Sequence, residues 1–284
     1  MQLITKAFAK VNLTLDCVGK REDGYHLLRS IMQPISLYDT VSIECTGANG
    51  ITVICDQIPH SYNLATKAAH AFFHYAKISP YDQNIKIHID KNIPVAAGLG
   101  GGSTDAAIVI NLLNNMFSTR FDQDDLIKIA LEAGADVPFC LFQTPALVEG
   151  IGEKITLLAG LPELFFVLVK PSAKGSTTKM YQRLDEAGIS NQDYTEKALL
   201  ALKAKDTEKF CTSFGNAFSD LWKDAHYHHI RVLAQNFGAL NTSLTGSGPT
   251  VFSVFDKEES AQSCYQALSC DFTEVFLAKT INSL

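Results

Sequence analysis

The 284-residue chain lacks a long hydrophobic run. No stretch approaches the roughly 18 apolar residues that a membrane-spanning helix needs, and the first residues alternate polar and apolar side chains instead of forming the apolar block of a signal peptide. The seven cysteines are scattered and contain no Cys-x-x-Cys pair, which argues against a disulfide framework or a structural zinc site. We therefore expect a protein of the reducing cytoplasm.

The chain also lacks an excess of basic residues. Lys and Arg number 24 against 30 Asp and Glu, a net charge of -6, so we expect neither nucleic acid nor a membrane surface as a partner. With 46% hydrophobic and 19% charged residues, the composition is typical of a globular protein and too apolar for a disordered one. The length suggests one large domain or two fused domains.

The pattern of apolar residues predicts an α+β protein. Strands are expected at 3–18, 41–45, 51–55, 84–89, 146–149, 164–169, 242–255 and 273–279, where residues alternate or form short β-branched runs. Helical spacing is found at 63–77, 105–117, 122–133, around 175–185, 193–203, 224–237 and 257–268. We place one domain at 1–160 and a second at 161–284.

A glycine-rich segment precedes the very apolar helix at 105–117. It consists of Pro94, Val95, Ala96, Ala97, Gly98, Leu99, Gly100, Gly101, Gly102, Ser103 and Thr104. Without side chains, successive backbone N–H groups and the positive end of the helix dipole can converge on an anion. Three or four charge-assisted hydrogen bonds of about 1.5 to 3 kcal/mol each could hold a triphosphate without a basic surface. The alternative is a flexible connection.

Other glycine motifs do not fit this segment. A Gly-x-Gly-x-x-Gly motif starting at Gly98 would need glycine or alanine where Ser103 stands, and the chain has no Gly-Lys-Ser or Gly-Lys-Thr. Neither Ser103 nor Ser247 lies in a Gly-x-Ser-x-Gly elbow. The sequence therefore supports neither a dinucleotide-binding domain nor a serine hydrolase of that type.

Three segments together resemble the GHMP kinases, named for galactokinase, homoserine, mevalonate and phosphomevalonate kinases. Residues 94–104 resemble their ATP loop, 7–13 (Ala-Phe-Ala-Lys-Val-Asn-Leu) their first motif and 244–249 (Leu-Thr-Gly-Ser-Gly-Pro) their C-terminal glycine turn. The resemblance implies a two-domain GHMP-kinase fold, with an N-terminal domain like ribosomal protein S5 and a C-terminal ferredoxin-like α/β sandwich. It also implies ATP, with Mg²⁺ delivered on the nucleotide.

Further segments resemble one branch of this superfamily. They are 23–26 (Asp-Gly-Tyr-His), 134–139 (Gly-Ala-Asp-Val-Pro-Phe) and 149–153 (Glu-Gly-Ile-Gly-Glu). That branch phosphorylates the 2-hydroxyl of 4-diphosphocytidyl-2-C-methyl-D-erythritol on the methylerythritol phosphate route to isoprenoid precursors. Ile151 stands where the branch usually has arginine, and Pro249-Thr250 where Ala-Cys is commoner. The resemblance implies a small substrate with a cytidine diphosphate moiety, and we expect a monomer or weak homodimer.

Phosphoryl transfer needs mainly positioning and charge stabilisation, so one carboxylate, one lysine and an N–H cradle can suffice. The resemblance gives these catalytic roles to Asp136, which would accept the proton, and to Lys10, which would orient that carboxylate and face the incoming charge. Because an aspartate has a pKa near 3.9, it would take the proton only late in the reaction. From the residues alone, a helix N-cap before Pro138 is the favoured explanation of Asp136, and Lys10 could be an ordinary edge-strand lysine.

The same resemblance implies the substrate-binding residues. Tyr25 and His26 would stack on and read the edge of cytosine, Tyr181 would cover its second face, and Asn12 would reach the erythritol hydroxyls. Asn63 and Lys91 would line the adenine pocket. From the residues alone, a buried pair is the commoner explanation of Tyr25 and His26, and helix capping and solvation explain Asn63 and Lys91 equally well. Ser103 and Thr104 could cap the helix or hold Mg²⁺, and we expect no metal ligand from the protein.

Two other functions remain open at this point. The first is another kinase of the superfamily, for homoserine or mevalonate, with a different acceptor pocket. The second is a non-catalytic RNA-binding module, since the N-terminal GHMP domain resembles a ribosomal protein. The net charge of -6 disfavours RNA binding.

Overall fold

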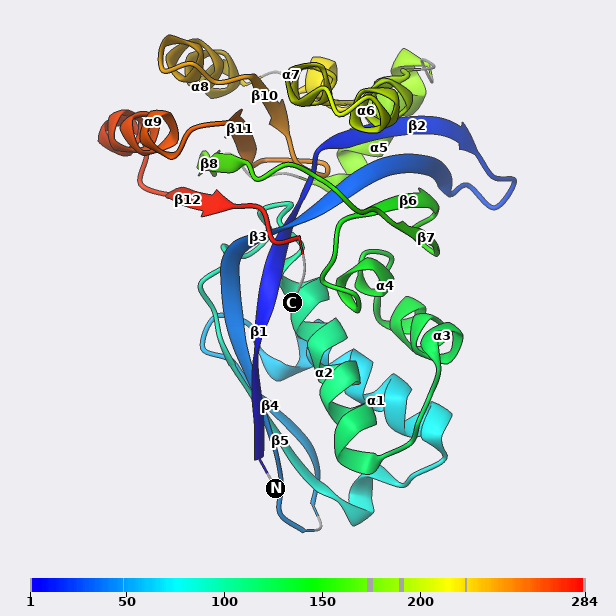
Figure 1. Cartoon of the computed structure of the whole chain (residues 1–284). Coiled ribbons are helices and arrows are strands. Elements are labelled where there is room, and N and C mark those ends of the chain that lie inside the picture. Colours follow the sequence, from blue (N-terminus) through cyan, green and yellow to red (C-terminus); the bar gives the residue numbers. More distant parts are fainter. Residues whose placement is uncertain (1, 48, 173–175, 189–191, 223, 283–284) are drawn as a thin grey trace. The chain divides into compact units, whose positions relative to one another are not determined.

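The computed structural model describes residues 2–47, 49–172, 176–188, 192–222 and 224–282 (Figure 1). The chain forms two compact units. The first unit comprises Met1–Ala9, Tyr38–Val95 and Gly100–Gln143, and the second comprises Lys10–Leu37, Ala96–Leu99 and Thr144–Leu284. Two paired long strands, β1 (Gln2–Asn12) and β3 (His26–Cys45), contribute residues to both units. The contiguous domains at 1–160 and 161–284 stay a prediction.

The first unit combines a small sheet with helices. The end of β3 pairs antiparallel with β5 (Asn84–Asp90), and β5 pairs parallel with β4 (Gly50–Ile54). Alternate residues of β5, namely Ile85, Ile87 and Ile89, are buried, as its period-two pattern predicts. The helices are α1 (Leu64–Ala76), α2 (Gly101–Phe117), α3 (Gln123–Ala133) and α4 (Val137–Cys140), with short 3-10 turns at His60–Tyr62 and Pro80–Asp82.

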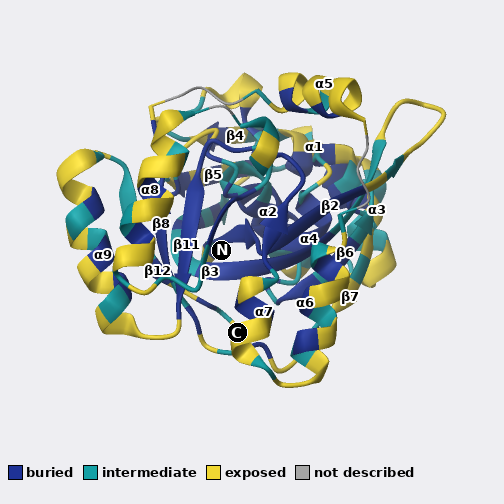
Figure 2. Cartoon of the chain, turned by 90° about the horizontal axis from the view of Figure 1, so that it is seen from above, coloured by how far each residue is buried: buried dark blue, intermediate teal, exposed yellow. Residues whose placement is uncertain are grey.

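The second unit contains two groups of strands. The start of β3 pairs antiparallel with β2 (Thr14–Lys20) and β6 (Ala146–Gly150); β6 pairs with β7 (Lys154–Leu157), and β2 pairs parallel with β9 (Gly215–Asn216). A separate four-stranded antiparallel sheet has the order β10 (Asn241–Leu244), β11 (Val251–Phe255), β8 (Phe165–Val169) and β12 (Val275–Lys279). The central strand β11 is buried along its whole length (Figure 2).

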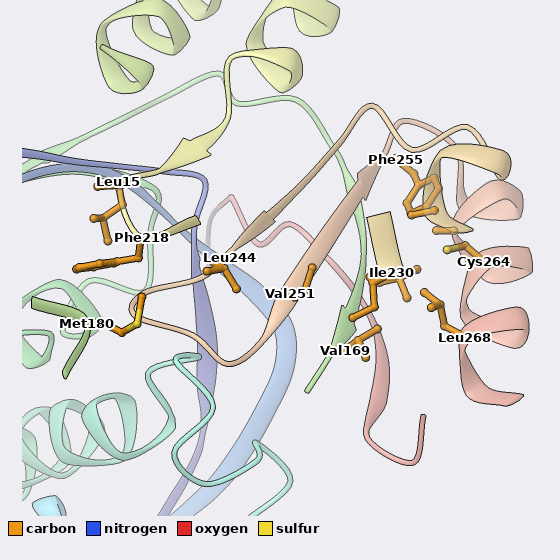
Figure 3. Packing of buried hydrophobic residues seen from close by; sticks show 14 of the residues in the cluster. Leu15, Val169, Met180, Phe218, Ile230, Leu244, Val251, Phe255, Cys264 and Leu268 are labelled. Carbon is orange, nitrogen blue, oxygen red and sulfur yellow. The ribbon is translucent and has the colours of Figure 1, made fainter. Parts of the chain in front are cut away.

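Helices cover this four-stranded sheet. They include α8 (Ala225–Asn236) and α9 (Glu258–Asp271), whose Ile230 and Leu268 join Val169 of β8 and Val251 of β11 in one buried cluster (Figure 3). The remaining elements are α5 (Thr177–Ala187), α6 (Tyr194–Lys203), α7 (Thr207–Thr212) and a 3-10 turn at Ser219–Leu221. The apolar faces of α8 and α9 are thus buried against this sheet, as expected for an α+β protein.

The α+β class predicted from the sequence is confirmed, with several differences in the elements. The strand predicted at 41–45 is only the end of β3, whose Pro34 interrupts the apolar alternation. The run predicted at 3–18 divides at Leu13, and the run at 242–255 divides at the glycine turn. The elements β7, β9 and α7 were not expected from the pattern. The helix predicted around 175–185 begins at a residue outside the described ones, and α5 starts at Thr177.

Two global expectations can be compared directly with the structure. Among the described residues, no cysteine takes part in a disulfide bond. Within the described ranges, no helix combines the length and apolar character needed to cross a membrane.

Candidate active site

The glycine loop at residues 94–104 takes its shape from two glycines with left-handed backbone. Gly98 has φ +77° and Gly100 has φ +71°, a region that side chains rarely tolerate. A Cβ atom on Gly98 would lie 2.6 Å from the carbonyl oxygen of Thr245 and 3.1 Å from that of Gly248. Packing in the second unit therefore requires glycine at position 98.

The next two glycines open α2 in the first unit, and they differ from each other. A Cβ on Gly101 would lie 2.9 Å from Ile93 and 3.1 Å from the Nζ atom of Lys91, whereas a Cβ on Gly102 would make an ordinary 3.5 Å contact with Leu64. The protein itself therefore tolerates a side chain at 102. The absence of one leaves space beside the first N–H groups of α2, which have no partners within the helix.

The buried side chains at the start of α2 have unpaired atoms. The hydroxyl of Thr104 is buried and makes no hydrogen bond in the structure, and Thr104 donates its main-chain N–H to Gly100 at 2.8 Å. The open first turn and this hydroxyl fit the phosphates of a nucleotide. Among the residues that the structure describes, no group of three or more His, Cys, Asp or Glu side chains could hold a metal ion.

In the second unit, Asn12 connects three segments that the sequence singled out. Its side-chain oxygen accepts hydrogen bonds from the Nζ of Lys10 at 2.7 Å and from the N–H of Gly246 at 3.0 Å, and its Nδ2 donates to Ser30 at 2.9 Å. Asn12 is 1% exposed. We call Asn12 with these three partners and Thr245 the Asn12 network.

The Asn12 network also reaches the glycine loop through the main chain. Lys10 donates its N–H to the carbonyl of Leu99 at 2.9 Å, and the hydroxyl of Thr245 lies 3.2 Å from the carbonyl of Gly98. The first motif, the loop and the C-terminal glycine turn are therefore joined by hydrogen bonds. Because Asn12 is buried and its oxygen is engaged, its visible role is to hold Lys10 and the turn, and its predicted contact with erythritol hydroxyls stays a prediction.

Asp136 takes the N-cap position of α4, with Pro138 in the first turn. The alternative that Asp136 is an N-cap is therefore confirmed for its position, but its side chain makes no capping hydrogen bond. The side chain is half-buried. Asp136 belongs to the first unit and Lys10 to the second, and their joint action stays a prediction.

The aromatic candidates for base recognition lie in the second unit. Tyr25 is 61% exposed, whereas the His26 side chain is 7% exposed and its Nε2 lies 2.7 Å from a carboxylate oxygen of Asp185. The rings of His26 and Tyr181 stack directly, with centroids 4.6 Å apart and an interplanar angle of 26°. This spacing has no room for a base between them, so of these three rings only that of Tyr25 is largely open.

Asp185 was not expected from the sequence, because 159 residues separate it from His26 and no motif marks it. It also pairs with Lys20 at 2.8 Å. Hydrogen bonds from Lys20 and from His26 hold the pKa of Asp185 below its usual range. The ionised carboxylate fixes the orientation of the histidine ring.

The predicted adenine residues lie in the first unit. Asn63 caps α1 by accepting the N–H of Ala65 at 3.0 Å, so the capping explanation is confirmed, and its buried Nδ2 makes no hydrogen bond. The Lys91 side chain is 2% exposed, so solvation does not explain it. Its Nζ contacts Asp39 at 2.5 Å and Asp105 at 2.8 Å. Sequence reasoning missed Asp39, which carries no motif.

The charges of this cluster shift each other's protonation. Burial raises the pKa of Asp105 to about 7, although Lys91 opposes the shift. Burial disfavours the charged form of Lys91, but the carboxylates of Asp105 and Asp39 outweigh it and raise the pKa of the ammonium. Lys91 therefore stays protonated.

The comparisons with known proteins concern the family and the fold of the chain. Residues 63–144 match the N-terminal domain of the GHMP kinases, and residues 230–274 match the C-terminal domain of the same kinases. A homoserine kinase from Cytophaga hutchinsonii superposes with a TM-score of 0.76 over 99% of this chain and 96% of that one, at 18% identity, which shows a shared fold. The class is therefore that of the GHMP kinases, and the predicted GHMP-kinase fold is confirmed.

Relatives with higher sequence identity point to one family within the GHMP kinases. A 4-diphosphocytidyl-2-C-methyl-D-erythritol kinase from Clostridium botulinum (strain Kyoto / Type A2) is 41% identical over 98% of this chain and 100% of its own length. A crystal structure of 4-(cytidine 5'-diphospho)-2C-methyl-D-erythritol kinase superposes with a TM-score of 0.82 at 29% identity, covering 98% of this chain and 99% of that one. The chain belongs to the 4-diphosphocytidyl-2-C-methyl-D-erythritol kinase family.

Proposed function

We propose that this chain transfers the γ-phosphoryl group of ATP to the 2-hydroxyl of 4-diphosphocytidyl-2-C-methyl-D-erythritol, giving the 2-phosphate and ADP. The reaction belongs to the methylerythritol phosphate pathway of isoprenoid precursor synthesis. The observation that carries the proposal is the Asn12 network, because it joins Lys10 to the glycine loop and the C-terminal turn that mark the kinase family. Family membership at 41% identity supports the choice of acceptor.

The nucleotide would be held mainly by backbone groups. The N–H groups at the start of α2 would bind the phosphates of ATP where Gly102 leaves space, and Thr104 would supply a hydroxyl. ATP would bring Mg²⁺ with it, and the metal would supply charge neutralisation at the phosphates. The other loop residues would line the nucleotide site; they are Pro94, Val95, Ala96, Ala97, Leu99, Gly100 and Ser103. Asn63 and Lys91 would lie beside the adenine.

Lys10 and Asp136 would perform the chemistry. Asn12 orients the Lys10 ammonium through a 2.7 Å hydrogen bond, so that its charge can stabilise the transferring phosphoryl group. Asp136 would accept the proton of the 2-hydroxyl as the oxygen bonds to phosphorus, since an aspartate is too weak a base to form an alkoxide beforehand.

Cytosine recognition would fall to the segment that leads into β3. The exposed ring of Tyr25 can stack on the base, and His26, held by Asp185, can offer a ring nitrogen to its edge. Tyr181 would support the ring of His26, and would cover the base only if the two rings separate. We propose a monomer or weak homodimer as the active form.

The acceptor is tested by measuring ADP release with the cytidylyl substrate beside homoserine, mevalonate and galactose. We expect turnover with the cytidylyl substrate alone, and competition by cytidine diphosphate. Turnover with homoserine or mevalonate would assign another kinase of the superfamily. RNA binding with a steep salt dependence, and no ADP release with any acceptor, would assign the binding module instead.

The catalytic carboxylate is tested by Asp136→Asn. We expect unchanged ATP affinity and a turnover at least about a hundredfold lower, because the general base is lost. Asp122→Asn is the matched control, since Asp122 caps α3 and asparagine caps equally well. Near-normal turnover of Asp136→Asn would contradict the role.

The nucleotide loop is tested best by Gly102→Ala. Gly101→Val is a poorer choice, because a Cβ at 101 would already press on Ile93 and Lys91. At position 102 we expect stability to be kept, since alanine favours a helix by about 1 kcal/mol relative to glycine. The ATP affinity, measured by calorimetry, should fall by at least about tenfold. Gly19→Ala, whose Cβ would meet Leu27 at an ordinary 3.6 Å, is the control. Unchanged ATP affinity would contradict phosphate binding by the N–H groups at the start of α2.

A further inference from the structure

Three buried charged side chains of the first unit form a cluster whose function the proposed mechanism leaves open. The Lys91 Nζ contacts Asp39 at 2.5 Å and Asp105 at 2.8 Å, and the three side chains are 0% to 2% exposed. We call these three residues the Lys91 cluster. The charged atoms of these side chains are paired with one another, so we argue that the cluster acts through the segments that it holds.

The first of these segments is the chain that enters the glycine loop. The second oxygen of Asp39 accepts the N–H of Asn92 at 2.6 Å and that of Ile93 at 2.8 Å. Asp39 lies on β3, immediately before Thr40, which pairs with Asp90 at the end of β5. Asp39 therefore fixes the backbone of residues 91–93 at the point where the strand ends and the loop begins.

The second segment is the start of α2. Asp105 lies in the second turn of this helix and receives the Lys91 ammonium, and the same Nζ atom lies 3.1 Å from the position that a Cβ on Gly101 would occupy. Lys91 therefore joins the entry of the loop to its exit. Between these two anchored points lie the residues that the nucleotide phosphates would approach.

The charge of the cluster indicates that stability is not its main purpose. One ammonium faces two carboxylates, and the Oδ1 atom of Asp105 is buried without a hydrogen bond. Buried ion pairs contribute little net stability compared with apolar side chains of similar volume, because desolvation offsets their attraction. What the cluster does provide is a fixed geometry for three segments of chain.

We propose that Asp39 and Asp105 are positioning residues for the nucleotide loop, and that they act through Lys91 to hold the entry of the loop and the first turn of α2 in the geometry that binds ATP. This inference rests on the proposed function, since it takes ATP as the ligand. It gives Lys91 a second role, as the side chain that links Asp39 to Asp105, in addition to lining the adenine pocket.

The experiment compares two substitutions at one position. Asp105→Leu releases Lys91 from α2 but leaves the balanced pair of Lys91 with Asp39, so the protein should fold. Asp105→Asn keeps a carbonyl oxygen that can accept the Lys91 hydrogen bond and serves as the conservative rescue. Asp125→Leu is the matched control in the same unit, because it removes the 2.7 Å tether from Tyr75 on α1 to Asp125 on α3.

We expect Asp105→Leu to raise the Kd for ATP about tenfold in calorimetry, which corresponds to about 1.4 kcal/mol, without a lower melting temperature and with the acceptor KM within about twofold. Asp105→Asn should stay within about threefold of the wild-type Kd, and Asp125→Leu within about twofold. Hydrogen exchange at the amide of Thr104, which donates to Gly100 at 2.8 Å, should accelerate in Asp105→Leu alone.

The results that overturn the inference are distinct from those that overturn the function. If the wild-type protein binds no ATP, the proposed function fails and the inference fails with it. If the wild-type protein binds ATP and Asp105→Leu binds it equally well, only the inference fails. An equal loss of affinity in Asp125→Leu would show general loosening of the unit and would also overturn it.

Discussion

The Asn12 network and the Lys91 cluster are both buried, but they hold their partners with different chemistry. Asn12 is a neutral amide whose oxygen and nitrogen are both hydrogen-bonded. The Lys91 cluster combines one ammonium with two carboxylates and leaves one carboxylate oxygen unpaired. Both arrangements contain a buried lysine, but the first pairs it with a neutral amide, whereas the second pairs it with two carboxylates.

This difference decides how much stability is lost when one partner of each cluster is removed by substitution. Loss of a neutral partner leaves an unpaired buried donor or acceptor, which costs about 1 to 3 kcal/mol. Loss of the single cation leaves uncompensated buried charge, which costs more because an ion is far harder to transfer from water than an amide. The glycine segments are thus held by the Asn12 network, where loss of a neutral partner costs less stability, and by the Lys91 cluster, where loss of the cation costs more.

The largest effect is expected for Lys91→Met. Two buried carboxylates lose their counter-ion, so the free energy of unfolding should fall by about 3 to 5 kcal/mol. Urea unfolding followed by circular dichroism measures the change. Adding Asp105→Leu to this variant should restore part of the stability, because one unpaired carboxylate is removed while Asp39 still accepts two backbone N–H groups. Strictly additive losses would show that the two residues do not interact.

A smaller effect is expected for Asn12→Ala. The Gly246 N–H and the Lys10 ammonium each lose one hydrogen bond, which should lower the free energy of unfolding by about 2 to 3 kcal/mol and turnover by at least about tenfold. Asn241→Ala is the control, because Asn241 donates to the carbonyls of Cys211 and Phe214 and belongs to none of the kinase motifs. Equal loss of turnover in both variants would make the role of Asn12 purely structural.

The two clusters also differ in what the sequence could reveal. The glycine loop, α2 and Lys10 were predictable because their signals are local: missing side chains, an all-round apolar helix and a short motif. Asn12 and Gly246 were found within motifs, but the hydrogen bond between them joins residues 234 positions apart. Nothing in the local pattern distinguishes Asp39 from a surface aspartate, since its partners are made by the pairing of β3 with β5.

The same reasoning explains the remaining discrepancies. The stacking of His26 on Tyr181 and its pairing with Asp185 depend on the packing of α5, which no spacing rule gives. The helix-cap alternative for Asp136 followed a sound preference for aspartate before a first-turn proline, yet the side chain makes no cap. Composition and period identify elements and loops, whereas tertiary pairing decides which polar atoms meet.

The Lys91 cluster should also make the stability of the protein depend on pH. Asp105 has a pKa of about 7 in the folded protein, raised mainly by burial, against a usual value of 3.8. Between these values the folded chain binds a proton that the unfolded chain does not, so the free energy of unfolding falls as pH rises through this window. The slope is at most about 1.4 kcal/mol per pH unit.

Urea unfolding of the wild-type protein and of Asp105→Asn between pH 5 and 8 isolates this slope, because contributions from the histidines cancel in the difference. Asparagine does not titrate, so the wild-type protein should lose stability relative to the variant as pH rises toward 7 and then run parallel above it. Asp206→Asn, at the exposed cap of α7, should run parallel to wild type throughout, since the pKa of Asp206 is lowered. A constant difference between wild type and Asp105→Asn would mean that Asp105 is ionised across this range, and that Lys91 compensates both carboxylates.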